Sequence, residues 1–151
     1  MKLPAWFKNS NPPNMKGFAF LIFCFSAISA IGGPPGAIVD SSDLARGARL
    51  AVRYNDGDKS FENDIESVAS ITAVLNYLEG FSNCAVITEN VSKDSIPFLI
   101  PKGYNSPLLA RVVDKYIADH PEKMSDPPGV IVWNALFHAF PNKDFKNFKS
   151  E

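Results

Sequence analysis

Cysteine and histidine are scarce in this chain, whose 151 residues include two of each. Only Cys84 lies outside the apolar N-terminal stretch, so the rest of the chain cannot close a disulfide within itself. The sequence also lacks Cys-x-x-Cys, His-Glu-x-x-His, Gly-x-Ser-x-Gly and any glycine-rich phosphate loop. These absences exclude a disulfide-stapled scaffold, and they predict a protein without enzymatic activity, cofactor or metal.

Excess positive charge is missing as well. The formal net charge is -1, whereas a protein that binds nucleic acid needs a basic surface to neutralise phosphates. With 46% hydrophobic and 21% charged residues, the composition is that of a globular domain. We therefore expect no nucleic-acid partner.

One long apolar run is present, from Gly17 to Ile31, and three lysines precede it, Lys2, Lys8 and Lys16. This order predicts a cleavable signal peptide over residues 1–32, with cleavage after Ala30 or Gly32. The alternative is an uncleaved anchor, but the run is shorter than the ~20 apolar residues that span a bilayer. Met15 is an alternative start of translation. The exported chain, residues 33–151, is then expected to have no stable membrane anchor.

Apolar residues recur at helical spacing in four segments after residue 40, which predicts an all-α fold, a compact bundle of about four helices in one domain. The first helix is expected from an N-cap at Ser41 or Ser42 to Tyr54. The second is expected over residues 61–87. It carries two apolar stripes, which predict a central helix packed on both sides.

In the second half of the chain, prolines mark the predicted starts and ends of helices. Ser106 and Pro107 are predicted to start a third helix, which ends before Pro121. A loop over residues 120–125 leads to a fourth helix, which starts at residues 126–127 and stops at Pro141. Residues 98–101 are expected to form a short apolar plug, and residues 142–151 a frayed tail.

Several isolated residues suggest chemistry, but each has a simpler structural interpretation. Cys84 with His120 or His138 resembles a thiol nucleophile and its base, although a buried, inert thiol and a half-buried histidine are favoured. Two acids flank His120 within residues 119–122. We favour the interpretation that they mark the end of a helix over the interpretation that they bind a metal. A second acidic cluster consists of Asp56, Asp58, Glu62, Asp64 and Glu66. We favour the interpretation that these acids cap the start of a helix over the interpretation that they form a calcium-binding loop.

Four motifs in order resemble one family. They are residues 74–80 (Val-Leu-Asn-Tyr-Leu-Glu-Gly), 98–101 (Phe-Leu-Ile-Pro), 112–121 (Val-Val-x-x-Tyr-Ile-x-x-x-Pro) and 135–142 (Ala-Leu-x-x-Ala-Phe-Pro-Asn). This part of the chain is similar to the Rap/Tai family of immunity proteins of bacterial type VI secretion. Val74, Leu99 and Asn142 stand where that family usually has cysteine. The resemblance therefore implies a divergent member in which two aliphatic residues replace the ends of one bridge.

The resemblance implies a periplasmic protein, often a homodimer, that sterically blocks a cognate peptidoglycan amidase effector with a protruding loop. Two loops fit this role, residues 89–95 and 122–126, and the predicted partner contacts are Lys93, Asp94, Met124 and Ser125. The alternative function is a periplasmic helical adaptor or stress chaperone that binds many clients without enzymatic activity.

Overall fold

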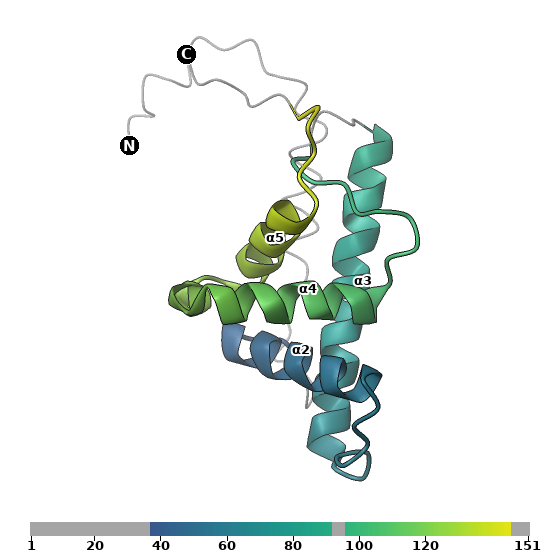
Figure 1. Ribbon diagram of the computed structural model, residues 1–151, viewed down its shortest axis with the longest axis vertical. Coiled ribbons are helices and arrows are strands. Elements are labelled where there is room, and N and C mark those ends of the chain that lie inside the picture. Colours follow the sequence, from purple (N-terminus) through teal and green to yellow (C-terminus); the bar gives the residue numbers. More distant parts are fainter. Residues whose placement is uncertain (1–36, 92–95, 146–151) are drawn as a thin grey trace, which may run out of the picture.

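The structure is a computed structural model that describes residues 37–91 and 96–145. This part of the chain is all-α and contains no strand, as predicted. Its elements are α2 (Ser41–Asn55), α3 (Ile65–Val91), α4 (Ser106–Asp119), the 3₁₀ helix η3 (Pro121–Ser125) and α5 (Pro128–Ala139). Figure 1 shows α2 and α4 side by side across α3, with α5 rising from the end of α4.

The core lies where these helices meet. Its completely buried side chains come from every α-helix and from the segment before α4, and the largest of them are Phe98, Leu44, Leu78, Ile96, Leu109, Ile131 and Leu136. Val74 is buried and Leu99 is partly buried in the same hydrophobic cluster. Val74 and Leu99 thus both contribute to this hydrophobic cluster, Val74 from α3 and Leu99 from the segment before α4. Tyr77 and Trp133 are partly buried against the core.

A close approach of α2 to α3 holds the centre of the molecule together. Gly47 of α2 is buried, and a Cβ added to it would lie 2.8 Å from the carbonyl oxygen of Ser70. The same added atom would lie 3.0 Å from Cβ of Val74. The two helix backbones therefore meet at a distance that only glycine allows.

The segment before α4 pairs with the chain after α5. Phe98 and Pro141 form an isolated antiparallel bridge, and the Leu99 amide donates to the Phe140 carbonyl over 3.0 Å. The buried Asn142 donates its side-chain amide to the Ile96 carbonyl over 2.9 Å. The prediction of a frayed tail is therefore wrong at its first residue, because hydrogen bonds hold the buried Asn142 in place. Residues 146–151 of the predicted tail lie outside the described residues.

Three predicted features of α3 differ from the structure. The helix ends at Val91 and not at residue 87, so residues 89–91 of the predicted loop are helical. The helix begins at Ile65 and not at residue 61, because the Asp64 carboxylate accepts hydrogen bonds from the Glu66 amide and the Ser67 hydroxyl. Phe61 lies in the preceding turn. The prediction that α3 packs on both sides is also wrong: α2 and α4 pack against one face, and Ile65 on the other face is 86% exposed.

Candidate functional site

The connection between α4 and α5 forms a tight turn at one side of the molecule (Figure 1). We call residues 120–127 the α4–α5 corner. The helix α4 ends when the His120 amide donates to the Tyr116 carbonyl and Pro121 prevents continuation. The 3₁₀ helix η3 follows and closes with a 2.9 Å hydrogen bond from the Asp126 amide to the Lys123 carbonyl. Pro127 then precedes the first turn of α5.

The α4–α5 corner is anchored from within. The Ser41 hydroxyl at the start of α2 donates a short hydrogen bond to the Met124 carbonyl, and the Met124 side chain packs against the core. The side chains of Glu122, Lys123 and Ser125 are exposed. A short polar segment is thus presented to solvent on a backbone that packs against α2 and α4, which lowers the ordering cost of binding a partner.

The two histidines of the chain meet beside the α4–α5 corner. The ring centroids of His120 and His138 lie 5.6 Å apart, although 18 positions separate the two residues in the sequence. Tyr116 contacts both rings, at 4.6 Å from His120 and 5.5 Å from His138. The Glu122 carboxylate lies 3.4 Å from Nδ1 of His120. A sequence search could not find this cluster, because the angle between α4 and α5 creates it.

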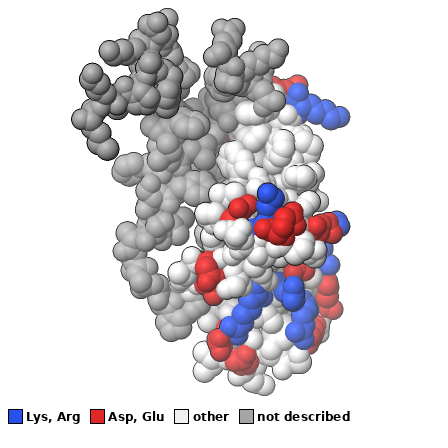
Figure 2. Space-filling view, turned by 90° about the vertical axis from the view of Figure 1, so that its left-hand side faces the viewer, with Lys and Arg blue, Asp and Glu red and all other residues white. Residues whose placement is uncertain are grey.

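Figure 2 faces the side of the molecule on which the corner lies. Acidic and basic side chains gather over the middle and lower part of the described surface, and the surface above them carries few charges.

Two of the four predicted partner contacts are part of this corner. The Ser125 side chain is exposed, whereas the Met124 side chain is partly buried and packs against the core. Lys93 and Asp94 lie outside the described residues. The sequence did not predict that Glu122, Lys123 and the histidine pair are groups of the same corner. Glu122 and Lys123 do fall within the predicted loop over residues 122–126.

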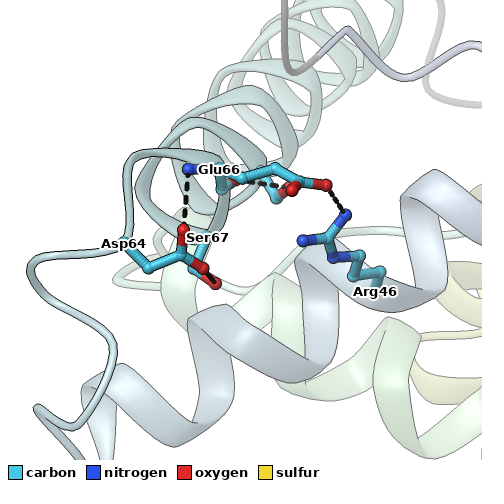
Figure 3. A network of polar contacts seen from close by, with 5 residues as sticks. Arg46, Asp64, Glu66 and Ser67 are labelled. Atoms are coloured by element: carbon cyan, nitrogen blue, oxygen red, sulfur yellow. Dashed lines mark hydrogen bonds and ion pairs between the residues drawn. The ribbon is translucent and has the colours of Figure 1, made fainter.

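The acidic cluster at the start of α3 is a set of ion pairs and caps. Arg46 of α2 binds Glu66, while Asp64 caps α3 (Figure 3). The hydrogen bond from the Ser67 hydroxyl lowers the pKa of Asp64. The other acids of the cluster pair with cations: Asp56 with Arg111, Asp58 with Arg53 and Glu62 with Lys59. The capping interpretation thus fits Asp64, and the described residues hold no group of three or more His, Cys, Asp or Glu side chains suited to a metal ion.

Cys84 and His138 are both more exposed than the sequence predicts. Cys84 is partly exposed on α3, and His138 is exposed on the last turn of α5. Both expectations of burial are therefore wrong, because each residue lies at the margin of the face that its helix buries. Cys84 lies on α3, whereas His120 and His138 lie beside the α4–α5 corner.

Within the described residues, no helix is both long enough and apolar enough to span a bilayer. The apolar run at residues 17–31 lies outside them. The resemblance to the Rap/Tai immunity proteins rests on the order of the four motifs and stays a prediction. Comparisons with protein families, with curated protein sequences and with solved structures found no match for this chain.

Proposed function

We propose that this protein is a periplasmic immunity protein that binds a cognate peptidoglycan amidase effector of type VI secretion and blocks its cleft. The choice of partner comes from the resemblance in motif order. The observation that supports a binding role is the α4–α5 corner, where a fixed backbone presents Glu122, Lys123 and Ser125 to solvent.

The corner has the properties of a rigid inhibitory segment. Its backbone hydrogen bonds are formed within η3, and its one large apolar side chain, Met124, is directed against the core. Little conformational entropy is left to lose when such a segment enters a cleft, so most of its contact energy contributes to affinity. The exposed cation of Lys123 and the carboxylate of Glu122 offer polar contacts at the rim of the cleft.

Inhibition is the property to test. The exported chain, residues 33–151, contains every buried residue of the described core, which runs from Leu44 to Asn142. This chain is immobilised, periplasmic extract is passed over it, and the retained proteins are identified by mass spectrometry. A retained cell-wall hydrolase is then assayed on purified peptidoglycan with and without the chain. We expect one stoichiometric amidase and its complete inhibition.

A matched pair of variants locates the contact. Ser125→Arg adds a large cation to the exposed corner, and Asn63→Arg adds the same group to the exposed turn before α3. We expect Ser125→Arg to weaken inhibition by a factor of 10 or more, equivalent to ~1.4 kcal/mol. Asn63→Arg is expected to leave it unchanged. Retention of many substoichiometric clients instead of one hydrolase supports the adaptor or chaperone alternative, and equal inhibition by both variants contradicts the assignment of the corner.

A further inference from the structure

The fold brings both imidazoles of the chain to one place. His120 is the C-cap residue of α4, and His138 lies in the last turn of α5. The sequence contains no other histidine. The sequence alone predicts no metal site, because 18 positions separate the two residues, yet their ring centroids are 5.6 Å apart. The chemistry of two adjacent imidazoles therefore has to be judged from the structure.

The separation of the two rings is that of two imidazoles bound to one transition-metal ion. An imidazole nitrogen binds zinc at ~2.0–2.1 Å, which places the centre of the ring ~3.2 Å from the ion. Two rings bound at a tetrahedral or somewhat wider angle then have their centroids ~5.2–5.8 Å apart. The 5.6 Å between His120 and His138 lies inside this range. The last torsion of a histidine side chain is broad, and its axis passes close to the ring centroid, so each ring can turn a nitrogen toward the ion at the same separation.

Two neighbouring side chains hold and orient the rings. The buried Tyr116 contacts both of them, at 4.6 Å from His120 and 5.5 Å from His138. The Glu122 carboxylate lies 3.4 Å from Nδ1 of His120. A carboxylate beside one ring nitrogen fixes the tautomer and leaves the other nitrogen free for a metal, as the second-shell carboxylates of metal-bound histidines do. Nε2 of His120 is thus the nitrogen available to an ion.

The charges around the pair suit a cation. Asp119 and Glu122 lie on either side of His120 in the sequence, and Lys115 on α4 is paired with Asp119 over 2.8 Å. Within the described residues, no third His, Cys, Asp or Glu side chain completes a set of three ligands. Water therefore has to fill the remaining positions around an ion, which makes this an open site and not a closed structural one.

From these observations we propose that His120 and His138 bind one divalent transition-metal ion, with water in its remaining coordination positions. This proposal does not rest on the proposed function. Imidazole ligands suit copper, nickel and zinc, whereas calcium and magnesium prefer oxygen ligands. Cu²⁺ binds most tightly in the Irving–Williams order. The ion joins the end of α4 to the end of α5, so it stabilises the folded chain by mass action.

Isothermal titration of residues 33–151 with Cu²⁺, Zn²⁺ and Ca²⁺ tests the site. The chain carries no histidine tag, and Cys84→Ser removes its only thiol. We expect one Cu²⁺ per chain, weaker binding of Zn²⁺ and no binding of Ca²⁺. His120→Ala and His138→Ala should each weaken Cu²⁺ binding at least 10-fold, because a single imidazole cannot chelate. Both side chains are at least partly exposed, so the fold is preserved, and far-UV circular dichroism verifies this.

A matched variant keeps two histidines and changes only their separation. Phe137→His with His138→Ala moves the imidazole by one position, which turns it ~100° around α5, and both positions are exposed. We expect this variant to bind Cu²⁺ as weakly as His138→Ala does.

Thermal unfolding gives a second readout. Zn²⁺ at about 100 times its Kd should raise the unfolding midpoint of the chain with both histidines by at least about 5 °C, and it should leave that of His138→Ala unchanged. If the chain with both histidines binds neither Cu²⁺ nor Zn²⁺ with a Kd below about 100 µM, the proposal is overturned. Binding that is as tight in either single variant, or in the variant with the moved histidine, overturns it equally.

Discussion

Gly47 and Gly80 lie on neighbouring helices, and the structure predicts that the same change to alanine has opposite effects at the two positions. Both glycines are in helices and neither has a positive φ. Alanine is favoured over glycine in a helix by ~1 kcal/mol, so propensity alone predicts stabilisation twice. The difference comes from the space around the new methyl group.

At Gly47 the new methyl group has no room. It would lie 2.8 Å from the Ser70 carbonyl oxygen and 3.0 Å from Cβ of Val74, and neither atom can rotate away because backbone geometry fixes both. α2 must move away from α3, which loosens a contact between completely buried side chains. Overpacking of this kind costs ~1–3 kcal/mol, so after the gain of ~1 kcal/mol in propensity we expect a net loss of up to ~2 kcal/mol for Gly47→Ala.

At Gly80 an added methyl group meets nothing within 4 Å. Gly80→Ala should therefore raise the free energy of unfolding by ~0.5–1 kcal/mol. Urea unfolding followed by far-UV circular dichroism measures both changes. If Gly47→Ala is as stable as the wild type or more so, α2 and α3 do not approach as described, and the reasoning fails.

Three further predictions concern the core, the end of the chain and pH. Phe98 is completely buried and packs edge-on against Trp133 at 5.0 Å, so Phe98→Ala should lower the free energy of unfolding by ~3–5 kcal/mol, measured by urea titration. Asn142→Ala removes the donor to the Ile96 carbonyl and should cost ~1–3 kcal/mol, with faster proteolysis after α5 as a second readout. Hydrogen bonds from Ser60, followed by one from Arg53, lower the pKa of Asp58 to about 2. Its contribution to stability is complete above its unfolded pKa near 3.8 and is lost as the pH falls through about 2. Asp58→Asn should therefore flatten the stability profile between these values, and an unchanged slope in acid titration contradicts the assignment.

The number, type and order of the helices could be predicted from the sequence, because proline and apolar spacing mark them locally. The helix starts could be predicted only to within a few residues. Asp40 caps α2 and Asn105 caps α4, each one or two positions before the predicted serines. Ser41 donates its hydroxyl to Met124, and Ser106 donates its hydroxyl to Glu79. Each serine hydroxyl is thus used in a tertiary hydrogen bond, and the residue before the serine caps the helix. The local sequence does not show which partner a serine hydroxyl binds, so it could not predict this difference.

The candidate site could be predicted in its outline but not in its geometry. The prolines at 121 and 127 define a connection between two helices, and two predicted contacts, Met124 and Ser125, fall within it. Which of them is exposed depends on how η3 packs against α2. The meeting of His120 with His138 depends on the angle between α4 and α5, which long-range packing determines.

The two predicted apolar stripes of α3 are buried only in part. They predict a helix covered on both sides, yet within the described residues both stripes are buried toward one side, at Ile71, Val74, Leu78 and Ala85, while Ile65 and Val68 are exposed. A sequence pattern records which side chains need to leave water, but it does not record which molecule covers them.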